Sequence, residues 1–196
     1  MNHNIQCTCG QLRGHVLGKG VSNRVVCYCS DCQAFAKFLG RQDEVLDGHG
    51  GTEIIQVAQP RVNFTQGKAN LAAMRLSEKG IVRWYASCCK TPIGNTLANP
   101  KISFIGLIHT LLDREHLDRD FGTSIAAVNV DSAMGEPKPK QKGLLGTLMR
   151  FFWMIIAMRL SGKYKKSQLF TASGELVVAP TVLTTQERRN LKASLS

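Results

Sequence analysis

The sequence has few prolines, few aromatic residues and no visible internal repeat. Only six of its 196 residues are proline, and 7% are aromatic. With 43% hydrophobic and 20% charged residues, the composition excludes a collagen-like, low-complexity or wholly disordered chain. A chain of this length predicts one domain, or one domain with an appendage, that buries roughly 70% of its unfolded surface without disulfides.

The amino terminus lacks a basic segment followed by an apolar run, so we expect no secretory signal and a cytoplasmic location. The seven cysteines, an odd number, are then expected to be reduced. The sequence also lacks a phosphate-binding glycine motif, because Gly18-Lys19-Gly20 is not followed by the remainder of one. Candidate chemistry is therefore sought at the cysteines.

The cysteines fall into three clusters with tight spacing. Thiolates one and three positions apart on a turning backbone can converge on one ion, with zinc–sulfur distances of about 2.3 Å. Zinc is the expected metal because it is redox-inert and binds sulfur well. Buried structural cysteines are the alternative, but they have no reason to cluster. The clusters are Cys7-Thr8-Cys9-Gly10, Cys27-Tyr28-Cys29-Ser30-Asp31-Cys32 and Cys88-Cys89.

With the later segment Arg83-Trp84-Tyr85-Ala86-Ser87-Cys88-Cys89-Lys90-Thr91-Pro92, this order resembles the glutathione-dependent formaldehyde-activating enzyme (Gfa) family, whose relatives include centromere protein V. Family members typically read CxCG, then CHCxxC, then FCxxCGTPL. The resemblance covers roughly residues 5–130. The chain departs from the pattern twice, with Tyr28 in place of the usual His and Ala86 in place of the first cysteine of the third motif.

The resemblance implies a mainly β protein with the zinc-binding β-tent fold, in which small antiparallel sheets meet over the metal sites. It implies one or two zinc ions per chain, one structural and one reactive. The structural zinc would be held by Cys7, Cys9 and Cys89. The reactive zinc would have an open fourth position and would be held by the catalytic cysteines Cys27, Cys29 and Cys32.

The fourth ligand of the first zinc stays open, because Ala86 removes a thiol. Cys88 has the wrong spacing, since adjacent side chains in extended backbone point to opposite faces, and it becomes a ligand only if the chain turns sharply. His3 is another candidate because it lies near Cys7 in the sequence. Asp31 could orient a water or thiol on the reactive metal, or could be a turn residue that binds backbone N–H groups.

Residues 1–134 are predicted to form the zinc-binding β domain. Apolar and alternating runs predict strands over 53–57, 61–65, 71–76, 81–85 and 102–108. The third and fourth of these, 71–76 and 81–85, are expected to form a hairpin with its turn at 77–80.

Residues 135–196 are predicted to form an appendage with a basic linker, an apolar helix over about 144–160, a final hairpin over 169–178 and a short terminal helix. Thr184 and Glu187 have the spacing of a capping box. The net charge is +11, and subtracting the eight basic residues of 137–170, which holds no Asp or Glu, leaves +3. Those eight are Lys138, Lys140, Lys142, Arg150, Arg159, Lys163, Lys165 and Lys166.

Three interpretations of the apolar helix compete. The first is a helix packed on the domain or across a homodimer, which is common for apolar runs of this length. The second is a helix at an anionic membrane surface, where basic residues flank Phe151, Phe152 and Trp153. The third, nucleic-acid binding, lacks a recognition motif, and no specific nucleic acid is expected.

Two functions follow from these features. The first is a Gfa-like carbon–sulfur lyase that acts on the adduct of a small aldehyde with a thiol such as glutathione. The second is a non-catalytic, zinc-stabilised binding module whose basic apolar helix meets a protein partner or membrane surface. Binding of glutathione at the CxCxxC cysteines separates the two.

Overall fold

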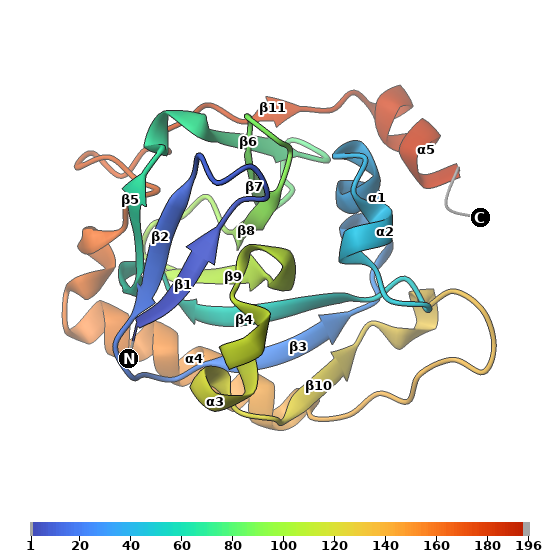
Figure 1. The fold of residues 1–196 in the computed structure, drawn as a ribbon, viewed down its shortest axis with the longest axis horizontal. Helices are drawn as coiled ribbons and strands as arrows, with labels where there is room; N and C mark the ends of the chain where they lie inside the picture. Colours follow the sequence, from blue (N-terminus) through green and yellow to red (C-terminus); the bar gives the residue numbers. More distant parts are fainter. Residues whose placement is uncertain (1, 194–196) are drawn as a thin grey trace.

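The computed structural model describes residues 2–193, and the protein is mainly β (Figure 1). A large sheet of eight strands is antiparallel except at its edges, where both outermost strands pair in parallel with their neighbours. The strand order is β10 (Ile125–Val128), β3 (Asn23–Cys27), β4 (Thr52–Ala58), β9 (Phe104–Ile108), β8 (Pro92–Thr96), β7 (Val82–Ala86), β6 (Leu71–Arg75) and β11 (Thr181–Val182). A small antiparallel sheet contains β1 (Asn2–Gln6), β2 (Arg13–Leu17) and β5 (Val62–Gln66).

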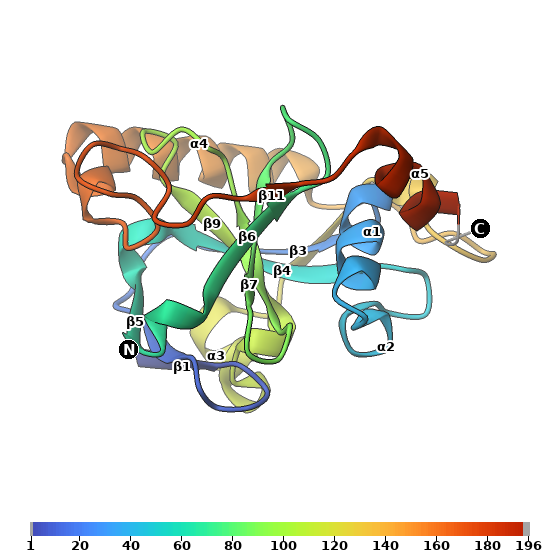
Figure 2. The ribbon, with the colours of Figure 1, turned by 90° about the horizontal axis from the view of Figure 1, so that it is seen from above.

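Five α-helices accompany the sheets within the described residues, and α4 lies across the large sheet on the side opposite β1 and α3 (Figure 2). They are α1 (Ser30–Phe38), α2 (Gln42–Val45), α3 (Leu117–Phe121), α4 (Leu144–Leu160) and α5 (Thr185–Ala193). The short 3-10 helices of the described residues are η1 (Gln59–Arg61), η2 (Lys68–Asn70), η3 (His109–Leu111), η4 (Arg114–His116), η5 (Val130–Ser132) and η6 (Lys163–Lys166).

The strands expected from the apolar runs are present as β4, β5, β6, β7 and β9, and β6 and β7 form the expected hairpin across 77–80. Strand β5 belongs to the small antiparallel sheet, whereas the other four belong to the eight-stranded sheet, which differs from the expected small antiparallel sheets. It is larger and mixed, because β10 and β11 return from distant parts of the chain and add parallel edges.

The main core lies between the two sheets. Ile5 and Phe64 from the small sheet pack in one apolar cluster with Ile55, Trp84 and Leu107 of the large sheet, and all five are at least 98% buried. The indole N–H of Trp84 donates to Thr96 Oγ1 at 2.9 Å, so its one polar atom is satisfied inside the core. This core fixes the small sheet on the large one.

Helix α4 occupies the predicted residues 144–160 and is held on the sheet by a few buried contacts. Met154 is 3% exposed, and the ring of Phe151 meets Phe104 edge-to-face at 4.9 Å. Asn23, at the start of β3, donates to the carbonyl of Thr147 at 3.1 Å and accepts from Arg150 Nε at 2.7 Å. One side of the helix is therefore docked.

The opposite side of α4 is not covered by the rest of residues 2–193. Leu145, Met149, Phe152 and Trp153 are all more than half exposed, and Leu160 is 85% exposed. The domain therefore covers only one side of this helix, and cover of the outward side by a second subunit stays a prediction. The sheet can reach only one face of a helix whose apolar residues lie all round it. Within the described residues, no helix is both long and apolar enough to cross a membrane.

The chain after α4 returns over the molecule. Residues 169–178 form the expected turn, with Phe170 bridged to Leu176 and Thr171 N bonded to the carbonyl of Glu175 at 2.8 Å, although no regular strand pair forms there. The capping box of the last helix is confirmed, because the carboxylate of Glu187 accepts from both the N–H and the hydroxyl of Thr184 at 2.8 Å.

A matched pair of substitutions in α4 tests its docking. Met154→Ala removes a buried side chain, so we expect a loss of about 2–5 kcal/mol of unfolding free energy. Met149→Ala changes a side chain that is 66% exposed and should stay within about 0.5 kcal/mol of the parent. Urea denaturation followed by circular dichroism measures both. Equal effects from the two variants would contradict this docking of α4.

Candidate metal centres

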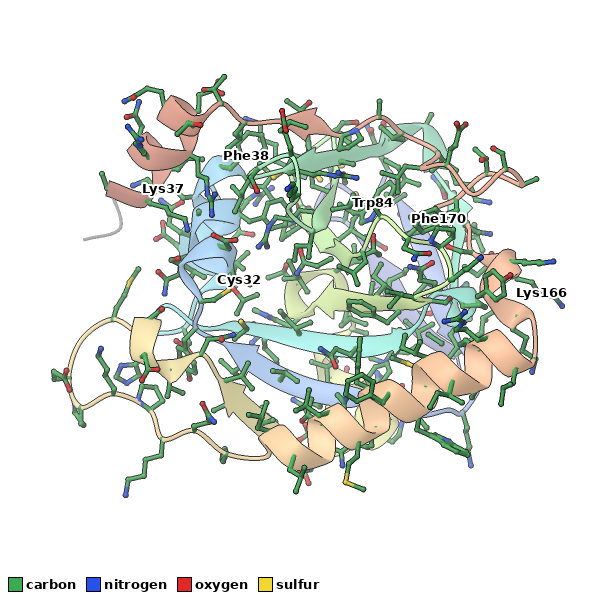
Figure 3. All side chains as sticks on the ribbon, turned by 180° about the vertical axis from the view of Figure 1, so that it is seen from behind. Cys32, Lys37, Phe38, Trp84, Lys166 and Phe170 are labelled. Carbon is green, nitrogen blue, oxygen red and sulfur yellow. The ribbon has the colours of Figure 1, made fainter. Side chains whose placement is uncertain are left out.

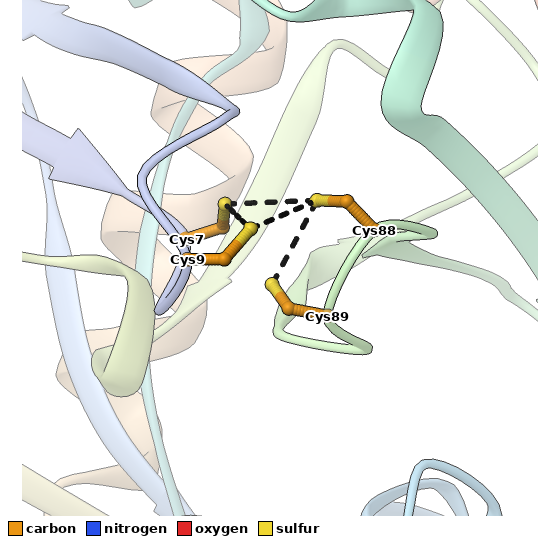
Figure 4. A group of neighbouring side chains, drawn as sticks. All are labelled: Cys7, Cys9, Cys88 and Cys89. Carbon is orange, nitrogen blue, oxygen red and sulfur yellow. Dashed lines mark hydrogen bonds between the residues drawn. The ribbon is translucent and has the colours of Figure 1, made fainter.

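Four cysteine thiols from two turns converge on one point (Figure 4). Cys7 and Cys9 come from the turn after β1, and Cys88 and Cys89 come from the turn between β7 and β8. The Sγ atoms are 3.5 Å apart for Cys7 and Cys9, 3.4 Å for Cys9 and Cys88, 3.8 Å for Cys7 and Cys88, and 3.8 Å for Cys88 and Cys89. All four lie within 4.8 Å of one another. We call this set the four-thiol cluster.

These distances fit a tetrahedral ion. Four sulfurs placed about 2.3 Å from a central zinc are separated by about 3.8 Å along each edge of the tetrahedron. The four measured separations, from 3.4 to 3.8 Å, approach that edge length without any disulfide between the cysteines. The residues present therefore fit a structural zinc site with four thiolate ligands.

Cys88 belongs to this cluster because the chain turns sharply after β7. Lys90 has φ +55°, in the left-handed region, and its N–H bonds to the carbonyl of Ala86 at 2.7 Å. Two adjacent thiols can then face the same point, which extended backbone forbids. Of the two candidates for the fourth ligand, Cys88 and His3, the structure thus places Cys88 in the cluster. The buried Ala86 ends β7 and offers no ligand atom.

Polar contacts hold the two turns around the four-thiol cluster. Leu12 N donates to Cys7 Sγ at 3.2 Å, and Thr8 and Thr91 join their hydroxyls at 2.8 Å. Burial raises the pKa of the Cys89 thiol, but hydrogen bonds from Thr8 and Thr91 prevail and lower that pKa to about 5. The thiolate form that a metal needs is therefore favoured at Cys89.

A second group, the three-thiol cluster, contains Cys27, Cys29 and Cys32, whose sulfurs lie within 4.8 Å of one another. Cys27 ends β3, Cys29 is the residue before α1, and Cys32 lies in its first turn (Figure 3). Residues three apart at a helix start share one face, as in a capping box, so the CxxC spacing brings both thiols together. The positive end of the helix dipole favours thiolates there.

Two side chains donate to this cluster. Asn129, with φ +56°, places its Nδ2 3.2 Å from Cys27 Sγ, and Arg83 Nη1 lies 3.9 Å from Cys32 Sγ. Hydrogen bonds from Cys29 and Cys32, with a further one from Asn129, lower the pKa of the Cys27 thiol far below its usual value. Hydrogen bonding to Cys27 raises the pKa of the Cys29 thiol and raises that of the Cys32 thiol well above its usual value. The arrangement therefore favours one thiolate, at Cys27, and a bound cation would be needed to favour the other two.

The buried charge of Arg83 is a second indication that the three-thiol cluster can hold a metal ion. Its side chain is 2% exposed, stacks over the ring of Phe35 at 5.4 Å and donates to Asn95 Oδ1 at 3.3 Å. Among residues 2–193, no carboxylate forms an ion pair with it. Buried charges are normally paired, and a zinc ion with three thiolates carries a net charge of −1. The three-thiol cluster is the partner that the burial of Arg83 calls for.

Three comparisons place the chain among known proteins. A family model described as a family of unknown function, DUF6151, matches residues 2–172. The chain belongs to this family. No curated protein matches. Among solved structures, a Rhodobacter sphaeroides protein from structural genomics is similar at 18% identity and a TM-score of 0.41, over 62% of this chain and 97% of that chain.

The structure places the remaining candidate residues of this DUF6151 member away from the sulfurs. His3, considered as a fourth ligand, instead bonds through Nδ1 to Asp120 Oδ2 at 2.8 Å and packs on Phe121, because β1 directs it into the core opposite the turn. Asp31 faces α5. Its carboxylate pairs with Lys192 at 2.6 Å and Arg188 at 3.5 Å, both on α5.

Tyr28, which replaces the usual His of the CxCxxC motif, is buried, and its side chain reaches Asp47 in the loop after α2. Its hydroxyl donates to Asp47 Oδ2 at 3.2 Å, and Gly51 packs so closely that an added Cβ would lie 2.5 Å from the ring. Tyr28 therefore packs in the interior beside Gly51. The three thiols therefore assemble without a contribution from the position where the sequence departs from the Gfa pattern.

Sequence reasoning missed several residues around both clusters: Arg83, Asn129, Thr8, Thr91 and Arg41. Arg41 Nη2 donates to Thr8 Oγ1 at 3.0 Å and to the carbonyl of Cys89 at 2.6 Å, so it connects the end of α1 to the four-thiol cluster. The sequence did carry a signal for Arg83 and for Asn129. An arginine inside an apolar strand needs a buried partner, and asparagine after a strand is a common left-handed residue.

Removing a thiol of the four-thiol cluster should destabilise the whole molecule. Cys88→Ser is expected to abolish one metal equivalent and to lower the melting temperature by several degrees, because metal bound only by the folded chain adds to its stability. Ser87→Ala, at the exposed neighbouring position, is the matched control and should change neither quantity. Metal analysis and thermal denaturation measure the effect. Unchanged metal content in Cys88→Ser would remove Cys88 from the ligand set.

Proposed function

We propose that this protein binds two zinc ions, one structural in the four-thiol cluster and one reactive in the three-thiol cluster, on a β-tent fold of the Gfa type. The observation that carries the proposal is the difference between the clusters. The first offers four thiols at tetrahedral separations, whereas the second gathers three, and no fourth Cys, His or carboxylate joins it among residues 2–193. Three protein ligands and one free position are typical of catalytic zinc.

The reaction we propose is that of a carbon–sulfur lyase acting on the adduct of a small aldehyde with a thiol such as glutathione. A zinc ion would supply Lewis acidity and would lower the pKa of a thiol bound to it. In the forward direction the thiol sulfur bonds to the carbonyl carbon, the π electrons move to the oxygen, and the thiol proton ends on that oxygen. The reverse reaction breaks the same carbon–sulfur bond.

The residues of the chain have separate roles in this proposal. Cys29 is half-buried while Cys27 and Cys32 are buried, so a substrate would approach from the side of Cys29. Asn129 fixes Cys27 through its 3.2 Å hydrogen bond, which orients that ligand. Arg83 offsets the negative charge that accumulates when a substrate thiolate joins three cysteine thiolates.

A titration with glutathione tests the proposal. The zinc-loaded protein should contain two zinc ions, and after replacement by cobalt(II) its visible absorption should change when glutathione is added. S-methylglutathione has no free thiol and should leave the spectrum unchanged. Cys29→Ser/Cys32→Ser should retain one metal ion and lose the response. Protein that binds no metal, or an equal response with S-methylglutathione, would contradict the proposal.

Arg83 gives an independent test. Arg83→Met should lower the zinc affinity of the three-thiol cluster by about 10- to 100-fold, the usual effect of losing a group that supports metal ligands. Arg83→Lys should retain most of the affinity, and Arg189→Met, an exposed arginine on α5, is the charge-matched control. Chelator competition measures the affinity, and retention of the first zinc shows that the variant has folded. An affinity unchanged in Arg83→Met would exclude this role.

A non-catalytic binding module is the second candidate function, and one observation favours it. The outward side of α4 exposes large apolar side chains that the domain does not use. A module of this kind would bind zinc at both clusters and would show no thiol response. Because α4 and the thiols lie on different elements, the two functions can also coexist in one chain.

A further inference from the structure

The outward side of α4 is an apolar stripe on the surface of the molecule. At 100° per residue, seven large side chains cover an arc of about 140°. Arg159 is the one charged residue of α4 within that arc. Monomeric proteins rarely expose a patch of this kind without a function for it. The seven residues, called the α4 outer face, are Leu145, Leu148, Met149, Phe152, Trp153, Ile156 and Leu160, each 41% to 85% exposed.

Exposed cations continue from the end of this stripe. Arg159 in the last turn is followed by Lys163, Lys165 and Lys166 of η6, all exposed, and Figure 3 shows Lys166 just beyond the end of the helix. The sequence has no Asp or Glu from 137 to 174, a range that also holds the linker lysines before α4. Neither flank of the α4 outer face therefore brings its own acidic residue.

A groove joins the stripe to these cations. It encloses about 430 Å³ between α4 and the loop after β2, with Trp153 and Met158 on its apolar side and Lys19, Arg61, Lys163 and Lys166 as its cations. No acidic residue is among those that line it. An apolar wall beside four cations suits a ligand with acyl chains and an anionic head.

Arg61, in the wall of the groove, is held by hydrogen bonds to backbone carbonyls. Arg61 donates to the carbonyls of Leu17 at 3.0 Å, Gly18 at 2.9 Å and Val21 at 3.3 Å, and no ion pair to a carboxylate forms within residues 2–193. These bonds fix the guanidinium in place while leaving its charge unbalanced. The groove thus keeps a net positive charge that does not depend on its lysines alone.

We propose that the α4 outer face and its groove bind the surface of a membrane that contains anionic phospholipids, with α4 lying in the plane of the interface. Basic residues beside large apolar ones, including Trp and Phe, are the composition of interfacial helices. Each lysine or arginine near an anionic surface adds to the attraction. The helix binds along the surface, and its 17 residues do not need to span the bilayer.

Charge favours a membrane over a second copy of the chain. Twofold pairing through the α4 outer face would set the basic flanks of one copy against those of the other, with no acidic residue between 137 and 174 to offset them. Like charges brought together oppose association. A lipid surface supplies both the apolar volume and the negative charge that the two features require.

The two tryptophans make the native chain its own reporter. Trp84 is fully buried, whereas Trp153 is 63% exposed and lies in the α4 outer face. Vesicles of phosphatidylcholine with phosphatidylglycerol should shift the tryptophan emission to shorter wavelength, and Trp153→Phe should abolish the shift. Vesicles of phosphatidylcholine alone should have little effect, and 0.5 M salt, on the order of a 4 Å screening length, should reverse the binding.

Charge-reversal variants give the matched comparison. Lys163→Glu/Lys166→Glu should weaken vesicle binding at least about tenfold, since both residues line the groove. Lys68→Glu/Lys79→Glu makes the same change of net charge at exposed positions in the 67–70 and 77–80 turns, and should bind nearly as the parent does. Vesicle cosedimentation measures the binding curves of the parent and the two double variants, and circular dichroism verifies the fold of each variant.

Three results would overturn the proposal. One is equal binding to neutral and anionic vesicles, and another is an equal loss in the two charge-reversal variants. The third is a doubling of the mass in solution, measured by light scattering, that Leu145→Gln/Met149→Gln abolishes, because the α4 outer face would then serve a second copy. None of these results bears on the zinc sites, whose variants leave α4 intact.

Discussion

The meeting of two cysteine-bearing turns is the contact on which this structure depends most. The turn after β1 and the turn after β7 belong to different sheets, and the four-thiol cluster joins them at sulfur separations of 3.4 to 3.8 Å. Thr8 with Thr91, and Arg41 with the carbonyl of Cys89, reinforce the same point. The turn after β1, the turn between β7 and β8, and the segment after α1 therefore meet at a point where a single ion can bind. The apolar core fixes the sheets face to face, and this junction fixes their ends.

The same arrangement places the second cluster. Cys29 directly precedes helix α1 and Cys32 lies in its first turn, so the start of the helix holds two thiols of the three-thiol cluster. Arg41, between α1 and α2, contacts the four-thiol cluster. Arg83 of β7 is buried beside Cys32, where its positive charge would offset the negative charge of adjacent thiolates. The positions of the two clusters thus depend on a small number of residues.

Sequence predicted the parts of the fold that local pattern decides. The strands β4, β5, β6, β7 and β9 and the helix α4 follow from apolar runs, and the cap at Thr184 follows from a local hydrogen-bonding pattern. It missed β8, whose Pro-Ile-Gly-Asn-Thr sequence reads as a turn. That strand is buried because Gly94 lets β9 approach so closely that a Cβ would lie 2.5 Å from the carbonyl of Gly106. Such fits depend on neighbours far along the chain.

The candidate site was predictable as far as spacing decides it. CxC and CxCxxC named five of the seven thiols, and the turn that recruits Cys88 depends on a left-handed Lys90 that no motif encodes. His3 was misjudged because nearness in sequence is not nearness in space on a strand that leads into the core. The side of α4 that faces solvent could not be known either, since its apolar residues lie all round the helix. Figure 2 shows that α4 and the β1 turn occupy opposite sides of the large sheet, so a surface-bound α4 leaves the four-thiol cluster away from the membrane.

X-ray absorption at the zinc edge tests the central claim most directly. In Cys27→Ser/Cys29→Ser, which should keep only the first zinc, the account predicts four sulfur ligands at about 2.3 Å. In the fully loaded parent it predicts an average below four sulfurs together with a lighter ligand, because one of the two ions has an open position. Four sulfurs per zinc in the parent would contradict the open site, and fewer than four in the variant would contradict the four-thiol cluster.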